Sequence, residues 1–149
     1  MINILLADDN DTVRQGVRAL LKDEPDFCIL GEAGDGLETA GLVKQLHPDV
    51  LVVDLMMGDM NGIEVARQVC KSSPCTNVVI ISMYGNEAYA FEALRVGAKA
   101  YVLKEAVPSE LAHAIREVAA GRPYLSPPLS EESLKAYRRK LDSTQQSRV

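Results

Sequence analysis

The stretch VLVVDLMM, residues 50–57, decides the fold, because a short apolar run that ends in a carboxylate is an unusual strand. Three β-branched residues among its first four predict a strand buried on both faces, as in a parallel sheet covered by helices. Asp54 would then lie at the carboxyl end of this strand, where open parallel sheets bind ligands. An aspartate there can also simply cap the next turn or helix. The charge alone leaves both interpretations open.

A second strand-like run favours the functional interpretation. Residues 2–7 are also apolar, and Asp8 and Asp9 follow them directly. Parallel strands end at the same edge of a sheet, so we expect these two carboxylates and that of Asp54 to share one pocket. Like charges this close raise each other's pKa and destabilise the fold unless a cation compensates them. Hard divalent cations with oxygen ligands, above all Mg²⁺, suit such a pocket.

Strand-like runs alternate with amphipathic helical patterns five times along the chain. This alternation is typical of βαβ units, and it predicts a doubly wound α/β sheet with helices on both faces. Asp11 and Thr12 are expected to cap the first helix. His47 should end the second helix, because it precedes a proline, and Gly97 should end the fourth. The expected strands are 2–7, 27–33, 50–54, 78–82 and 100–103.

All the predicted strands except the second end in polar groups: Asp8 and Asp9, Asp54, Ser82 and Lys104. Taken singly, Ser82 is a turn residue and Lys104 a solvated surface charge. Together they indicate phosphoryl transfer to a carboxylate, with Asp54 as the nucleophile and Mg²⁺ between Asp9 and Asp54. Lys104 would pair with one phosphoryl oxygen, and Ser82 would donate a hydrogen bond to another.

Four ordered motifs carry a family resemblance: ADDN at 7–10, VDLMM at 53–57 with Gly62 after it, ISMY at 81–84, and GAKAYVLK at 97–104. With them the chain resembles the receiver domain of two-component response regulators, in particular the NarL/FixJ (LuxR-like) transcription factors. The resemblance covers residues 1–122. It implies a flavodoxin-like, CheY-like (βα)5 three-layer sandwich with a parallel five-stranded sheet in the order 2-1-3-4-5.

The resemblance also implies a role for each residue of the site. Asp54 would accept a phosphoryl group from the phosphohistidine of a sensor histidine kinase, as a phosphoacceptor rather than an enzyme, with self-catalysed phosphorylation and slow dephosphorylation. Mg²⁺ would be bound by Asp9, Asp54 and the backbone carbonyl of Met56, with Asp8 acting through a water molecule.

Ser82 and Tyr101 resemble the switch pair of the family. The Ser82 hydroxyl is expected to move toward the aspartyl phosphate, which leaves room for the Tyr101 ring to turn inward. The surface of the fourth helix, fifth strand and fifth helix would then change and favour a homodimer.

Two positions depart from the family pattern. Gly58 stands where a proline usually follows the phosphorylated aspartate by four residues, which predicts a looser loop over the site. Met83 follows the switch hydroxyl where the wider family prefers a small residue, and its bulk is expected to restrict access to the phosphoryl group.

Residues 123–149 read as a linker. A stiff, proline-rich connector spans residues 122–128, and residues 130–141 could form one further helix, with 142–149 frayed. The stretch resembles the connector that leads to a helix-turn-helix domain in this subfamily. No recognition helix follows residue 141, so we expect the DNA-binding domain to be absent from this chain and DNA to be bound only through it.

Composition limits the other classes of function. The chain has 149 residues, enough for one domain with a short appendage, and a net charge of −5 argues against binding nucleic acid by itself. Three cysteines without Cys-x-x-Cys spacing and two histidines do not suggest a zinc site. Neither a signal peptide nor an apolar run of the ~20 residues needed for a membrane span is present, so a cytoplasmic location is expected.

Three rival interpretations share parts of this pattern. A haloacid-dehalogenase-like phosphatase also phosphorylates an aspartate, but its general acid would stand at Met56. A flavodoxin-like cofactor binder needs a phosphate-cradling loop after the first strand, and the acidic residues 8–10 would repel that ligand. A receiver used as a phosphorylation-independent dimerisation module stays open, although the presence of the whole site set disfavours it.

Overall fold

The computed structural model describes the backbone of residues 1–146 and the side chains of residues 1–143. A parallel sheet forms the middle layer, with the strand order β2-β1-β3-β4-β5-β6. The doubly wound parallel sheet is thereby confirmed. The strands are β1 (Ile2–Ala7), β2 (Phe27–Ala33), β3 (Val50–Asp54), β4 (Asn77–Ser82), β5 (Ala100–Leu103) and β6 (Tyr124–Leu125).

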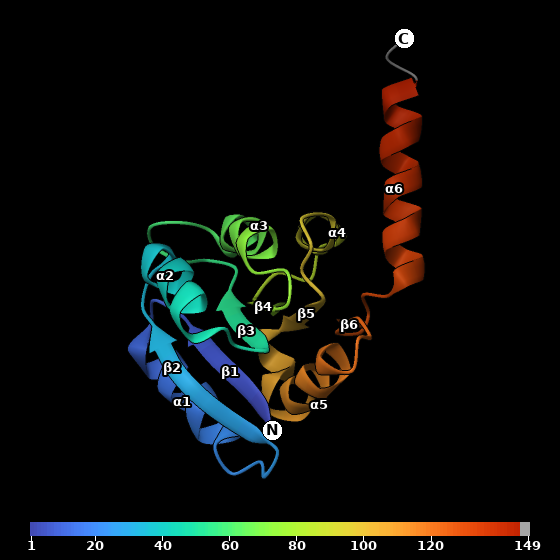
Figure 1. Ribbon diagram of the computed structural model, residues 1–149. Coiled ribbons are helices and arrows are strands. Elements are labelled where there is room, and N and C mark those ends of the chain that lie inside the picture. Colours follow the sequence, from blue (N-terminus) through green and yellow to red (C-terminus); the bar gives the residue numbers. More distant parts are fainter. Residues whose placement is uncertain (147–149) are drawn as a thin grey trace.

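Helices cover both faces of the sheet (Figure 1). One face packs against α1 and α5, and the other packs against α2, α3 and α4. No helix in the described part of the chain is long and apolar enough to cross a membrane. The helices are α1 (Asp11–Leu21), α2 (Gly36–Leu46), α3 (Gly62–Ser72), α4 (Glu87–Arg95), the short 3₁₀ turn η1 (Lys104–Ala106), α5 (Val107–Ala119) and α6 (Glu131–Gln146).

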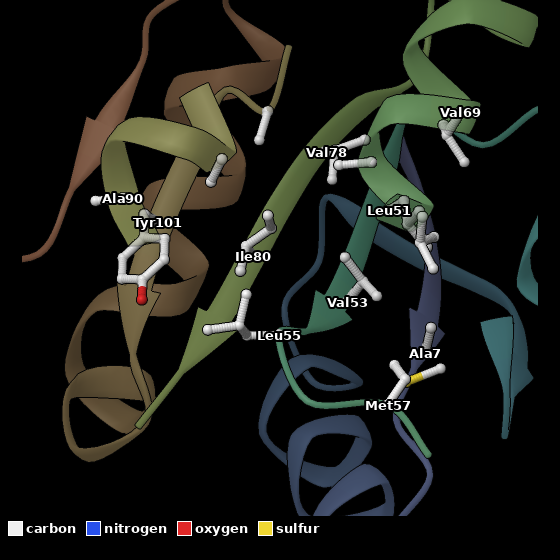
Figure 2. Close-up of a cluster of buried hydrophobic side chains, with 14 of the residues drawn as sticks. Ala7, Leu51, Val53, Leu55, Met57, Val69, Val78, Ile80, Ala90 and Tyr101 are labelled. Atoms are coloured by element: carbon white, nitrogen blue, oxygen red, sulfur yellow. The ribbon is translucent and has the colours of Figure 1, made fainter. Parts of the chain in front are cut away.

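The strand β3 shows why the sheet needs two helical layers. All five of its residues are buried, and the four apolar ones alternate between the two cores. Leu51 and Val53 join the core under α2, α3 and α4, which is the cluster in Figure 2, whereas Val50 and Val52 join the core under α1 and α5. Truncating a side chain such as Leu51 to alanine would cost about 2–5 kcal/mol of stability.

Capping residues fix where the helices begin and end. The first helix is capped by Asn10, whose side chain accepts a hydrogen bond from the Val13 N–H, so the prediction of Asp11 and Thr12 as caps is wrong by one residue. His47 ends α2 with a left-handed φ of 49°, and Gly97 follows α4 with a φ of 114°, as predicted. The helices therefore begin and end at short loops beside the strand ends.

The predicted count of five strands is wrong, because the connector adds a sixth. Residues 124–125 pair with β5, and Ser126 is fully buried there: its N–H donates to the Tyr101 carbonyl, and its hydroxyl accepts from the Leu103 N–H at 3.0 Å. The proline-rich composition of this stretch gives no local sign of the short strand. The connector is thus part of the sheet.

The last helix also differs from its prediction. It continues to Gln146, so residues 142–146 are helical rather than frayed, and residues 147–149 lie outside the described part. Its first turns contact α4: Leu134 is buried, and the Tyr137 ring lies 5.5 Å from the Phe91 ring between centroids. Beyond this contact α6 projects away from the sheet (Figure 1).

Candidate functional site

Two neighbouring strands bring a pair of buried carboxylates together. Ala7 pairs with Val53 in the register of β1 and β3, so the next residues along these strands, Asp8 and Asp54, are neighbours at the carboxyl edge of the sheet. Asp8 is 7% exposed and Asp54 is 4% exposed. Burial, and then the charge of Asp54, raises the pKa of Asp8 to about 6. The apolar strands thus hold two carboxylates close together and buried, where ionising both of them lowers the stability of the fold.

Lys104 provides the opposite charge. It follows β5, two strands away from β3, and its Nζ lies 2.6 Å from Oδ2 of Asp54. The other carboxylate oxygen, Oδ1, accepts a hydrogen bond of 2.9 Å from the Met56 N–H. These two contacts fix both oxygens of Asp54, so its carboxylate is held in one orientation at the crevice.

The third carboxylate lies apart from this pair. Asp9 is exposed, and a Cβ built on Gly58 would lie 3.3 Å from its Oδ2. In the part of the chain that the structure describes, no three His, Cys, Asp or Glu side chains converge as a set of metal ligands. The predicted three-acid pocket is therefore wrong in this detail: two acids are buried together, and the third lies at the rim beside the loop that follows β3.

A hard divalent cation still fits the donors present. Asp8 and Asp54 are buried carboxylates, and among the described residues Lys104 is the only side chain that forms an ion pair with either of them. Burial, and then the charge of Asp54, raises the pKa of Asp8, so a bound cation would favour the ionised form of this carboxylate. Oxygen donors of this kind, with a backbone carbonyl and water, suit Mg²⁺.

Ser82 and Tyr101 are linked through the backbone of Tyr84. The Tyr84 N–H donates to the Ser82 hydroxyl at 2.9 Å, and the Tyr101 hydroxyl donates to the Tyr84 carbonyl at 2.6 Å. Tyr101 is fully buried, and Figure 2 shows its ring in the core beside Ala90. Burial raises the pKa of Tyr101. The ring therefore lies inward in this structure, and its movement on phosphorylation stays a prediction.

The family follows from a comparison with known proteins. A family model described as the response regulator receiver domain matches residues 4–116. The chain belongs to this family. This result confirms the resemblance to receiver domains.

Similar proteins are transcriptional regulators. The chain is 42% identical over 120 residues to the uncharacterized transcriptional regulatory protein YxjL of Bacillus subtilis, covering 80% of this chain and 55% of the relative. It is 37% identical over 125 residues to the B. subtilis transcriptional regulatory protein LiaR, covering 84% and 59%. This receiver therefore spans less than two thirds of these relatives.

The fold is also that of solved regulators. A two-component response regulator of the LuxR family from Aurantimonas sp. SI85-9A1 aligns with a TM-score of 0.86 and 33% identity, covering 93% of this chain and 98% of that one. The alignment extends beyond the predicted limit of the receiver at residue 122. The C-terminal segment is thus included in the structural likeness.

Other positions near the site differ from expectation or were missed. The Met83 side chain is 75% exposed, which gives no support to the prediction that its bulk blocks the site. The loop after β3 is anchored by Asp59, a residue that looked like an ordinary loop acid. Ser126 was hidden in the proline-rich connector. Neither residue has a local signal, because their partners lie 23 residues away in the sequence.

Proposed function

We propose that this receiver is the phosphoacceptor of a two-component system and that Asp54 accepts the phosphoryl group from a histidine kinase. An oxygen of the Asp54 carboxylate attacks phosphorus, the bond from phosphorus to the imidazole nitrogen breaks, and the imidazole leaves with a proton from water. The supporting observation is the fixed Asp54 carboxylate, held at 2.6 Å from Lys104 beside the buried Asp8.

The other residues of the edge have distinct tasks in this proposal. Lys104 exchanges its contact with Asp54 for one with a phosphoryl oxygen, and the Ser82 hydroxyl donates to another. Mg²⁺ would be held by Asp9, Asp54 and the Met56 carbonyl, with Asp8 acting through water, and when bound it neutralises the phosphoryl oxygens. The receiver catalyses its own phosphorylation with the phosphohistidine as donor, and it then dephosphorylates slowly.

The output is proposed from the family and from the relatives. Residues 1–122 form the receiver, and residues 123–149 link it to an effector. Phosphorylation favours a homodimer, and transcription is regulated through a helix-turn-helix domain outside residues 1–149. A kinase that draws on ATP requires the receiver to be cytoplasmic.

Intact mass measures the proposed reaction. After incubation with phosphoramidate and Mg²⁺, the parent protein should gain one phosphoryl group, and Asp54→Asn should gain none. A full gain in Asp54→Asn would move the nucleophile to another residue. No gain in the parent, with a known receiver as the positive control, would sink the proposal.

One observation favours a second function, a dimerisation module that needs no phosphorylation. The Tyr101 ring is fully buried and its hydroxyl donates to the Tyr84 carbonyl at 2.6 Å, so packing and hydrogen bonding within this chain hold the ring in the inward position. Sedimentation with and without a beryllofluoride mimic separates the two functions. Phosphorylation control predicts tighter self-association with the mimic, and a smaller shift in Ser82→Ala and Tyr101→Ala. Equal self-association with and without the mimic would favour the module.

A further inference from the structure

The loop between β3 and α3 is tied to a different helix by Asp59. Its Oδ1 accepts a hydrogen bond from the Gly36 N–H at 2.8 Å, and its Oδ2 accepts from the Leu37 N–H at 3.3 Å. These are the first two residues of α2, whose N–H groups have no acceptor within the helix. The hydrogen bonds lower the pKa of Asp59, so the carboxylate is charged at neutral pH.

The contact does more than cap α2, because α2 has its own cap. Asp35 accepts a hydrogen bond from the Glu38 N–H at 2.7 Å. The loop also touches the helix directly: a Cβ built on Gly36 would lie 2.9 Å from Cβ of Met60. Asp59 and Met60 therefore join two segments that are far apart in the sequence.

The base of the same loop is fixed to the site strand. The Gly62 N–H donates to the Leu55 carbonyl at 2.7 Å, and Met56 forms an isolated antiparallel bridge with Asn61. A Cβ on Gly62 would collide with the carbonyl oxygen of Asp54, so the chain returns directly over the acceptor residue. Only the tip of the loop, residues 58–60, depends on α2 for its position.

The tip lies between α2 and the exposed acid of the site. On one side Asp59 binds the first turn of α2, and on the other side Gly58 lies against Asp9. A shift of the tip would change the space beside Asp9.

We propose that Asp59 is a positioning residue that holds this loop in place before any ligand binds. It touches neither the acceptor nor the metal of the proposed reaction. It fixes the tip of the loop and the space beside Asp9, and it supplies the restraint that a proline at position 58 would otherwise give. The proposal has two parts: the restraint itself, and its effect on Mg²⁺, which rests on the proposed function.

Amide hydrogen exchange of the metal-free protein tests the restraint. In Asp59→Ala, the peptide covering residues 55–62 should exchange about tenfold faster than in the parent, because local opening loses two charged hydrogen bonds. Asp35→Ala is the matched control: it removes a cap from the same helix end without touching the loop. Its exchange in residues 55–62 should equal that of the parent. Unchanged exchange in Asp59→Ala, or an equal increase in Asp35→Ala, would overturn the proposal.

Mg²⁺ titration and phosphorylation by phosphoramidate test the effect on the site. Asp59→Ala should weaken Mg²⁺ binding about tenfold. Asp59→Asn, which keeps one acceptor oxygen, should recover most of the loss, and Asp35→Ala should bind like the parent. If the parent itself neither binds Mg²⁺ nor gains a phosphoryl group, the proposed function fails, and the exchange result stands alone. If the parent does both and Asp59→Ala matches it, the positioning role fails while the proposed function survives.

Discussion

The carboxyl edge (Asp8, Asp54, Ser82 and Lys104) and the C-terminal segment (residues 122–143) are held by different kinds of interaction. At the edge, buried charges oppose one another and are balanced by a single lysine. In the segment, a buried serine hydroxyl bonds β5, and Leu129 and Leu134 pack into the core. An added charge should therefore change the contacts at the edge. The contacts of the segment, by contrast, only stabilise the fold.

The two regions meet on β5. Leu103 donates its N–H to Ser126 in the segment, and Lys104 follows it at the edge. The Tyr101 carbonyl accepts from the Ser126 N–H, while its hydroxyl reaches the loop after Ser82. The segment thus covers part of the surface of α4 and β5 that was expected to switch. A change in the position of Tyr101 would therefore first alter its contacts with the C-terminal segment of the same chain.

Loss of Lys104 should give the largest effect, and that effect should be on the rate of phosphorylation. Removing one preorganised charge from the transition state costs about 100- to 1,000-fold in rate. We therefore expect Lys104→Ala to slow phosphoryl incorporation by roughly that factor, followed by intact mass against time. Lys99→Ala, an exposed lysine before the same strand, is the control and should react like the parent. An unchanged rate in Lys104→Ala would remove Lys104 from the site.

The edge should also make stability depend on pH. The folded pKa of Asp8, about 6, is above its unfolded value of 3.8, so the folded state binds more protons between these values. Stability of the metal-free protein should fall as pH rises through that window, by up to about 3 kcal/mol, and stay low above it. Urea unfolding from pH 4 to 7 measures the fall.

Asp8→Asn and Mg²⁺ provide the checks on this pH effect. The variant should show a much flatter profile. At pH 7, Mg²⁺ at ten times its dissociation constant should add about 1.4 kcal/mol of stability to the parent. If millimolar Mg²⁺ leaves the melting temperature of the parent unchanged and Asp8→Asn raises it, the two acids are a destabilising pair and not a metal site.

The C-terminal segment should respond in the opposite way, with stability changed and chemistry kept. Ser126→Ala leaves the buried Leu103 N–H without its acceptor and removes a donor to Glu110, which should cost about 1–3 kcal/mol in urea unfolding. Its rate of phosphorylation should match that of the parent. Ser109→Ala, an exposed serine on α5, is the control. A slowed reaction in Ser126→Ala would show that the segment shapes the edge.

The smallest expected effect concerns Tyr124. Burial, together with the hydrogen bond to Glu110, raises its pKa from 10.0 to about 12. The folded state keeps this proton longer than the unfolded state, so the contribution of Tyr124 is present below pH 10 and is lost as pH rises toward 12. The difference in stability between the parent and Tyr124→Phe should shrink over that range. A constant difference would place Tyr124 outside the contacts that hold the segment.

The same two regions differ in what the sequence predicts. The strand ends at Asp8, Asp54, Ser82 and Lys104 were identified because an apolar run that stops at a polar group is a local signal, and their convergence follows from a parallel sheet. That arrangement is confirmed for Asp54 and Lys104. The chemical roles of these residues stay predictions.

The missed features all depend on contacts between distant residues. Two residues of β6 between prolines look like a connector, and only pairing with β5 makes them a strand. Asp59 looks like a loop acid until α2 is packed beside it. The inward Tyr101 ring depends on a carbonyl 17 residues earlier. Local patterns contain none of this information.

The most direct test of the account is to locate the phosphoryl group after reaction with phosphoramidate and Mg²⁺. Tandem mass spectrometry of a rapid acid digest should find it on the peptide that contains Asp54, in the parent and in Ser126→Ala alike, and nowhere in Asp54→Asn. A phosphoryl group on another peptide of the parent, or equal labelling in Asp54→Asn, would contradict the central claim that the buried, lysine-paired carboxylate of Asp54 is the acceptor.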